Sequence, residues 1–252
     1  MSPRVDVVIL AWNDGSVIDA AINSALASVG VDVRVVVVDN GSEPPVTPRS
    51  ADARMQIERN PENRGVAGGR NQGVLATDAA IVCFLDSDAR LEASCLRTLV
   101  AALDEPSVAV AVPVFTGQAP QQSAGRAPTL IRKVLRLCNV RSDYGATPRS
   151  CDGVWDVDFG IGACQVLRRS AFDAVGGLDE SYLFGPEDVD FCLRVRKAGW
   201  RVVQVRHARC DHPARRAHRG MLSRRGLAHA AAVCRHLWRH RGTARALRGV
   251  ST

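Results

Sequence analysis

The chain has 252 residues, a formal net charge of +7, 46% hydrophobic residues and 23% charged residues. This length and composition predict a globular protein with a substantial core, arranged as one large α/β domain rather than two small ones. No apolar run approaches the roughly 20 residues of a membrane-spanning helix, and the N-terminus shows no signal-peptide pattern.

The eight cysteines never occur in a Cys-x-x-Cys pair, and most of them lie inside apolar runs. This pattern predicts buried, reduced thiols in a cytoplasmic protein and argues against a zinc site. The cysteines are Cys83, Cys95, Cys138, Cys151, Cys164, Cys192, Cys210 and Cys234.

The first half of the chain alternates strand-like and helix-like segments. Residues 33–38 are all Val except Arg34, and continuous runs of this kind followed by helices are typical of a parallel sheet covered on both faces. The predicted strands are 5–11, 33–38, 54–58, 81–85 and 108–114, and the predicted helices are 16–28, capped by Ser16, one opened by residues 60–73, and 93–103. No internal repeat is visible.

Two segments of this half carry candidate chemistry. The glycine-rich segment 60–73 presents backbone amides, Arg64 and Arg70 to an anion, or its glycines only let the helix pack closely on the sheet. The strand 81–85 ends in Asp86-Ser87-Asp88. Two acids beyond the carboxyl end of a strand suit a divalent metal that carries a diphosphate, although the same residues also make an ordinary turn and helix cap.

The second half is less regular. Residues 115–152 are rich in Pro, Gly, Gln and Ser, and we expect a mobile segment that borders the substrate. Strands are predicted at 154–159 and 163–167, and a short helix starts at Ser170. Pro186 opens a helix whose first turn carries Glu187, Asp188 and Asp190. That helix ends at Gly199, and a last strand at 201–205 precedes a helical tail from Pro213.

Several of these motifs occur together in the order that is typical of one enzyme family. The chain resembles family 2 glycosyltransferases of GT-A fold, especially rhamnosyltransferase-like and galactofuranosyltransferase-like members, over roughly residues 5–212. The motifs that carry the resemblance are Trp12-Asn13, Val38-Asp39-Asn40-Gly41-Ser42, Asn63-Arg64-Gly65 with Arg70-Asn71, Asp86-Ser87-Asp88 and Gly185-Pro186-Glu187-Asp188.

The resemblance implies a GT-A, Rossmann-like α/β fold: a mixed, mostly parallel sheet flanked by helices, with a basic helical C-terminal tail. The glycosyltransferase domain would span residues 1–205. Its nucleotide-sugar-binding half would cover about residues 1–114 and its acceptor half residues 115–205. Residues 206–252 would form the extension.

The resemblance also implies a donor site that binds a nucleotide sugar with Mn²⁺ or Mg²⁺. Asp88 would be the direct metal ligand, with Asp86 and His212 completing the metal site. Asp39 would contact the base or ribose, although an Asp before Asn-Gly also caps a turn. A solvated arginine is the alternative for Arg64 and Arg70, and a surface histidine for His212. The implied donor-binding residues are Trp12, Asn13, Asp39, Asn63, Arg64, Gly65, Arg70, Asp86 and Ser87.

On the acceptor side, Asp188 matches the family's general base. It would remove the acceptor hydroxyl proton during one displacement, which inverts the anomeric carbon. Glu187 and Asp190 are equally explained as acids at a helix N-terminus. Trp155, Gly162 and Glu187 are predicted to line the acceptor site with Asp156 and Asp158, although a core Trp is equally consistent with the sequence.

The positive charge is concentrated in the tail. Residues 206–252 contain twelve Arg and one acid, Asp211, a net charge of +11 that leaves −4 of the total +7 for residues 1–205. The tail would lie on an anionic membrane with a lipid-linked acceptor, bind an acidic carrier protein, or cap the domain. No nucleic-acid partner is expected, since no recognition motif accompanies the charge. The predicted location is cytoplasmic, including the inner face of the membrane.

Under this resemblance a UDP- or dTDP-sugar is the favoured donor, but the sequence identifies neither the base nor the sugar. The acceptor is open among lipid-linked, carrier-linked and small molecules. Biosynthesis of a polysaccharide or of a glycosylated natural product fits equally. A sugar-phosphate nucleotidyltransferase is the rival enzyme, but the segment Trp12-Asn13-Asp14-Gly15 lacks the cation expected after its first strand. A sugar-nucleotide-binding protein without catalysis is the third alternative, and the presence of Asp86, Asp88 and Asp188 argues against it.

Overall fold

The computed structural model describes residues 2–117, 122–127, 153–182 and 185–213, together with residues 235, 236, 239 and 240. Its main strands are β1 (Arg4–Ala11), β2 (Asp32–Asn40), β3 (Met55–Asn60), β4 (Ile81–Asp86), β5 (Arg90–Leu91), β6 (Val108–Thr116), β8 (Val154–Asp156), β10 (Cys164–Arg168) and β11 (Arg201–Asp211). They form a nine-stranded sheet with the order β3-β2-β1-β4-β10-β6-β11-β5, and β8 also pairs with β11. A separate pair consists of β7 (Ala124–Gly125) and β9 (Phe159–Gly160).

The sheet is mixed. Strands β3, β2, β1 and β4 run parallel, as do β6 and β11, whereas β10 is antiparallel to both of its neighbours, β4 and β6. The valine-rich strand β2 is buried from Val35 to Asn40, as expected for a strand covered on both faces. The predicted α/β architecture is confirmed.

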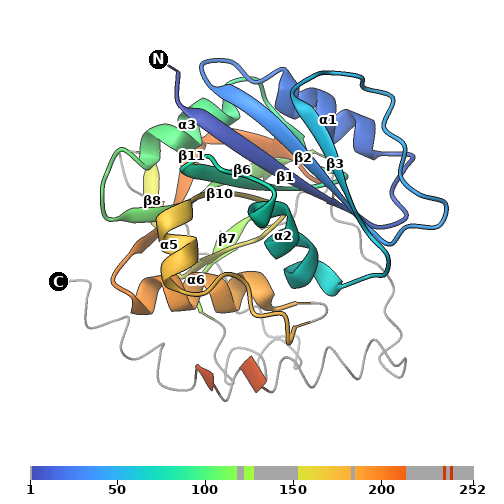
Figure 1. Cartoon of the computed structure of the whole chain (residues 1–252). Coiled ribbons are helices and arrows are strands. Elements are labelled where there is room, and N and C mark those ends of the chain that lie inside the picture. The colour runs from blue at the N-terminus through green and yellow to red at the C-terminus, as the bar shows by residue number, and fades with distance from the viewer. Residues whose placement is uncertain are drawn as a thin grey trace.

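Helices cover both faces of this sheet (Figure 1). Helices α1 (Ile18–Leu26) and α3 (Cys95–Ala102) pack on one face. Helices α2 (Gly65–Leu75), α5 (Arg169–Ala174) and α6 (Glu187–Lys197) pack on the other. The two apolar layers on either side of the sheet are the core, and they hold its carboxyl edge in place.

The glycines of α2 let this helix approach the sheet closely. A Cβ on Gly69 would lie 2.3 Å from Leu10 Cδ1, and a Cβ on Gly73 would lie 2.2 Å from Val8 Cγ1. Both distances are far below a normal van der Waals contact. Close packing of α2 on the sheet is therefore present in the structure, and the contact of this segment with an anion stays a prediction.

Three local predictions were wrong. Ser16 does not cap α1, which begins at Ile18, because the Asp14 carbonyl accepts the backbone N–H groups of Val17 and Ile18 instead. The strand predicted at 154–159 is divided, because Val157 N–H bonds to β11 whereas Asp158 N–H bonds to Gly125 of the small pair.

The third correction concerns the last strand, which was predicted to end at residue 205. It continues to Asp211, because pairing with β6 resumes after an irregularity between Val205 and Arg209. The short strand β5, which the sequence did not indicate, pairs with the extended end of β11. This extension carries the chain to His212.

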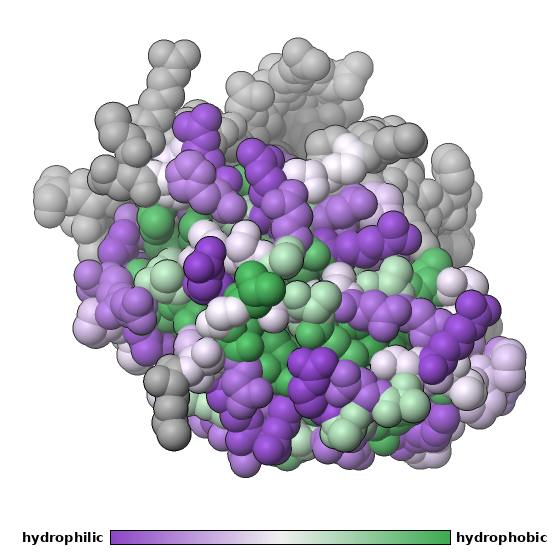
Figure 2. All heavy atoms as spheres, turned by 90° about the horizontal axis from the view of Figure 1, so that it is seen from above, coloured by the Kyte–Doolittle hydropathy of each residue, from purple (hydrophilic) through white to green (hydrophobic). Residues whose placement is uncertain are grey.

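The cysteines that the structure describes agree with the prediction of burial. Cys83, Cys95, Cys164, Cys192 and Cys210 are buried free thiols. The face in Figure 2 mixes hydrophilic side chains with smaller hydrophobic areas. Over the described residues, no helix has the length and apolar character needed to cross a membrane. The predictions for Cys138, Cys151 and Cys234, for most of segment 115–152 and for most of the tail lie outside the described residues.

Candidate active site

The polar side chains that follow β1, β2 and β4 meet at one edge of the sheet. The parallel register pairs Leu10 with Asp86 and Ala11 with Asp39, so the three strands end side by side. Beyond them lies a cavity of about 390 Å³, within the range of small-molecule sites. Its lining residues are Leu10, Trp12, Asp14, Asn40, Asn63, Gly65, Val66, Asp86, Ser87 and Asp88. Five of the predicted donor residues, namely Trp12, Asn63, Gly65, Asp86 and Ser87, are thus brought together.

Asp39 lies beside this cavity, and its carboxylate holds the loop of residues 42–46 in place. Its carboxylate accepts the backbone N–H groups of Ser42 at 3.1 Å and Val46 at 3.0 Å, and it pairs with Arg59 Nη1 at 2.6 Å. Asn13 adopts a positive φ of 58° and accepts the backbone N–H of Glu43 at 2.9 Å. The turn-capping alternative for Asp39 is therefore present in the structure, and its donor contact stays a prediction.

Asn40, which the sequence analysis did not single out, organises the loop before α2. Its Nδ2 donates to Asn63 Oδ1 at 3.1 Å and to the Gly65 carbonyl at 3.0 Å, and its Oδ1 accepts the Arg64 backbone N–H at 3.1 Å. The Arg64 side chain extends away to Gln72 and Glu180. Asn40 follows Asp39 directly, but nothing local in the sequence shows that its side chain turns towards residues 63–65.

Asp86, Asp88 and His212 form a group whose ligand atoms all lie within 4.8 Å of one another. His212 Nε2 lies 3.8 Å from Asp86 Oδ2 and 3.5 Å from Asp88 Oδ1. The His212 ring packs against Phe115 of β6, 5.1 Å between centroids, and is 7% exposed. Carboxylate oxygen and imidazole nitrogen suit Mn²⁺, and carboxylates suit Mg²⁺, so this donor set fits a divalent cation.

Arg70 joins the donor edge to the second half of the chain. Its guanidinium is buried, and Nη2 donates to Asp86 Oδ1 and to the Gly162 carbonyl, both at 2.7 Å. The ring of Phe84 lies under it at 5.4 Å. A Cβ on Gly162 would lie 2.2 Å from Arg70 Nη1, so only glycine leaves room for this contact. Arg70 thus orients Asp86.

Gly162 also holds Asp188. Its backbone N–H donates to Asp188 Oδ2 at 3.0 Å, while Asp188 Oδ1 accepts the N–H of Val189 at 2.7 Å. Burial raises the pKa of Asp188 above its usual value, although these hydrogen bonds and Arg70 oppose the shift. A carboxylate with a raised pKa is a better proton acceptor than an ordinary surface Asp.

Glu187 shares this turn and is 6% exposed. Burial, followed by the neighbouring charge of Asp188, raises the pKa of Glu187 to about 7. Its Oε2 has no hydrogen-bond partner among the described residues. The two adjacent carboxyl groups therefore differ, with Glu187 holding its proton into the neutral range.

The structure does not bring the remaining acceptor candidates to this edge. Trp155 is buried on β8 opposite Gln204, well before His212 along β11, with the Arg206 guanidinium 5.8 Å from its ring. Asp156 pairs with Arg201 at 2.9 Å, and Asp158 accepts the Ala127 N–H at 2.8 Å. This placement favours the core interpretation of Trp155.

The comparison with known families settles the class of protein. The model of "Glycosyl transferase family 2" matches residues 6–176. The chain belongs to this glycosyltransferase family. Family 2 membership argues against the nucleotidyltransferase alternative.

Curated relatives of this family 2 chain are longer. The pre-mycofactocin glycosyltransferase of Mycobacterium tuberculosis is 31% identical over 173 residues, 68% of this chain and 35% of that relative. The N-acetylglucosaminyl-diphospho-decaprenol L-rhamnosyltransferase of the same organism is 51% identical over 51 residues, 20% of this chain and 17% of that relative. The chain thus spans about a third of the length of the first relative.

Solved structures show the GT-A fold. A structure of GalNAc-T7 with UDP, GalNAc and Mn²⁺ superimposes with a TM-score of 0.62 at 15% identity, over 83% of this chain and 44% of that one. The mannosyltransferase PcManGT of Pyrobaculum calidifontis, in complex with GDP-Man and Mn²⁺, gives a TM-score of 0.61 at 19% identity, over 86% and 59%. The predicted family and fold are confirmed.

The raised pKa of Glu187 predicts how stability depends on pH. Between its ordinary pKa of 4.5 and about 7, the folded protein holds a proton that the unfolded chain releases, so stability falls as pH rises through this window. Glu187→Gln cannot ionise, so it should raise the free energy of unfolding at pH 8 by about 1–3 kcal/mol relative to the native chain. Urea unfolding at pH 4.5 and pH 8 measures this difference. An equal effect of the substitution at both pH values would contradict the raised pKa.

Proposed function

We propose that this chain transfers a sugar from a nucleoside-diphosphate sugar, UDP- or dTDP-linked, to an acceptor hydroxyl with inversion at the anomeric carbon. One observation carries the proposal: the Asp86, Asp88 and His212 group lies at the donor cavity, with Asp188 connected to Asp86 through Gly162 and Arg70. Family 2 membership and the GT-A fold support sugar transfer.

Asp88 and His212 would hold the metal, with Asp86 beside them. A divalent cation bound there would stabilise the negative charge that develops on the departing diphosphate. Mn²⁺ accompanies UDP or GDP-Man in the two structural neighbours. Arg70 keeps Asp86 oriented through a part-buried, charge-assisted hydrogen bond of 2.7 Å. Trp12, Asn63 and Gly65, which line the cavity, would contact the nucleoside.

Asp188 would act as the base. The acceptor oxygen forms its bond to the anomeric carbon while the bond from that carbon to the diphosphate oxygen breaks, and the hydroxyl proton passes to Asp188. The Gly162 N–H, 3.0 Å from Asp188 Oδ2, fixes the carboxylate for this transfer. Glu187, still protonated, would offer a hydrogen bond to the acceptor.

For the acceptor we propose only the reacting group, which is a hydroxyl. A relative that matches over 51 residues is named for a lipid-linked diphospho-decaprenol acceptor, and another for a pre-mycofactocin substrate. A polysaccharide precursor on a lipid and a natural product are therefore both consistent acceptors.

A binding panel tests the donor site. UDP-, dTDP- and GDP-sugars are added with and without Mn²⁺, and thermal unfolding is followed, since a ligand that binds only the folded state raises Tm. We expect a Mn²⁺-dependent rise with one nucleotide that disappears in Asp88→Asn. Asp188→Asn should keep that rise but lower turnover about 100-fold or more, because only the base is removed.

Asp156→Asn is the matched control, since this acid pairs with Arg201 away from the cavity. It should retain both the shift and the turnover. Full turnover in Asp188→Asn would exclude Asp188 as the base. Absence of any nucleotide-dependent shift, together with absence of turnover, would contradict the proposed donor site.

A second test separates Arg70 of α2 from Arg64, which directly precedes this helix. Arg70→Lys keeps the charge but cannot reach both Asp86 and the Gly162 carbonyl in the same way, so kcat/KM should fall about tenfold or more. Arg64→Lys is the control, because its side chain contacts Gln72 and Glu180 outside the cavity. Unchanged kcat/KM in Arg70→Lys would indicate that only the positive charge matters, and equal losses in the two variants would contradict a specific role of Arg70.

A further inference from the structure

The described part of the basic tail lies against the acceptor half of the domain. Arg235 Nη1 donates to the Ser181 carbonyl at 3.4 Å, and Arg239 pairs with Asp179. His236 packs edge-on against the fully buried ring of Tyr182, 6.5 Å between centroids. These contacts place the four described residues of the tail's helical part beside residues 179–182, which precede α6.

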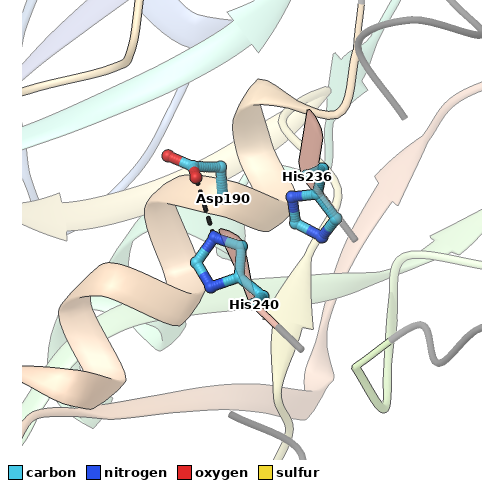
Figure 3. Close-up of side chains that lie close together, drawn as sticks. All are labelled: Asp190, His236 and His240. Atoms are coloured by element: carbon cyan, nitrogen blue, oxygen red, sulfur yellow. Dashed lines mark hydrogen bonds and ion pairs between the residues drawn. The ribbon is translucent and has the colours of Figure 1, made fainter. Parts of the chain in front are cut away.

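The central contact is made by Asp190, in the first turn of α6. Figure 3 shows His240 directed at this carboxylate, with His236 beside it. His240 Nε2 lies 2.8 Å from Asp190 Oδ1, and Arg239 Nη1 lies 3.5 Å from the same oxygen. Arg194 Nε, from the next turn of α6, lies 2.7 Å from the other oxygen, Oδ2. Within α6, Arg194 pairs with Oδ2 of Asp190, and the tail residues His240 and Arg239 pair with Oδ1.

The charge of Asp190 explains why this contact matters. The side chain is 0% exposed. Burial acts to raise the pKa of Asp190, but the hydrogen bonds from His240 and Arg194 outweigh it and hold the pKa below its usual value. A buried carboxylate that loses one of its cationic partners is strongly destabilised. Removal of the tail contact would therefore disturb the turn around Asp190.

The same three side chains, Asp190, His236 and His240, also have the spacing of a metal site, with ligand atoms within 4.8 Å. The surrounding charges oppose that interpretation. Arg194 and Arg239 both lie within 3.5 Å of the Asp190 carboxylate, and a divalent cation would be repelled by both guanidinium groups. The geometry points to an ion-pair contact between tail and domain.

This contact is connected to the proposed base. The Asp190 backbone N–H donates to the Pro186 carbonyl at 2.9 Å, closing the turn that carries Asp188. A carboxylate in the first turn also stabilises the helix N-terminus. The contacts of His240 and Arg239 with Asp190 therefore also hold the backbone turn from which Asp188 contacts Gly162.

We propose that Arg235, His236, Arg239 and His240 form an intramolecular docking segment, which binds the face made by Asp179, Ser181, Tyr182 and Asp190 and positions the first turn of α6. The importance of that turn for the reaction rests on the proposed function of Asp188. Part of the basic charge of the tail is thereby engaged by acids of its own domain, which corresponds to the capping interpretation of the tail.

Hydrogen–deuterium exchange on the full chain tests the docking without any substrate. In Arg239→Glu, the segment 186–193, whose amides begin at Glu187, should exchange about tenfold faster or more, because the docking segment is repelled by Asp179 and Asp190. Arg239→Lys keeps the positive charge and should restore protection. Arg49→Glu, the same charge reversal at a side chain 94% exposed beside Asp19, is the control and should leave residues 186–193 unchanged. His240→Ala provides a second variant that should also accelerate exchange.

Unchanged exchange at 186–193 in both Arg239→Glu and His240→Ala would overturn the proposal. A Zn²⁺-dependent rise in Tm that is lost in His240→Ala would also overturn it, by assigning these side chains to a metal. Because exchange is read without nucleotide sugar, failure of the docking is distinguishable from failure of the transferase proposal. The latter is tested independently by Mn²⁺-dependent donor binding.

Discussion

The guanidinium of Arg70 lies between the strand that carries Asp86 and the loop that carries Gly162, and it is 4% exposed. Through Nη2 it binds the Asp86 carboxylate and the Gly162 carbonyl, and the N–H of the same glycine binds Asp188. A buried cation of this kind is stable only when its hydrogen bonds are satisfied by the surrounding groups. Hydrogen bonds through Arg70 and Gly162 thus connect Asp86 at the donor edge to Asp188, the proposed base. A displacement of the donor half or of the acceptor half of the chain would break these bonds.

The second constraint is the length of β11. Its pairing with β6 resumes after Val205 and, with β5, carries the chain to Asp211, which places His212 beside Asp86 and Asp88. Phe115, at the end of β6, supports the His212 ring. The extended strand therefore brings a third candidate ligand, an imidazole, to the two carboxylates that follow β4. One sheet provides the scaffold for both parts of the candidate metal site.

The features encoded by local patterns were predictable from the sequence. The valine run predicted β2, and Asp86-Ser87-Asp88 at the end of a strand predicted the edge of the sheet where the cavity lies. Features that depend on contacts distant in the chain were not. The partner of Arg70 is 92 residues away at Gly162, and the role of Asn40 depends on a loop more than 20 residues later.

The same distinction explains the errors. Ser16 has the composition of a helix cap, but a backbone turn at Asp14 satisfies the first N–H groups instead. For Trp155 the sequence left an acceptor contact and a core position equally open, and its pairing with Gln204 along β11 favours the core position. His212 lies close to Asp88 because of the register of β11, which no local pattern specifies, and its role as a metal ligand stays a prediction.

The central claim is that the carboxyl edge of the sheet binds a divalent metal with a nucleoside diphosphate. A crystal structure of the chain soaked with Mn²⁺ and UDP, with anomalous diffraction recorded near the manganese edge, tests it most directly. The account predicts one anomalous peak in direct contact with Asp88 and His212, with the diphosphate beside it and the base in the cavity lined by Trp12 and Asn63. A peak at Asp190 and His240, or a diphosphate bound away from Asp86 and Asp88, would contradict it.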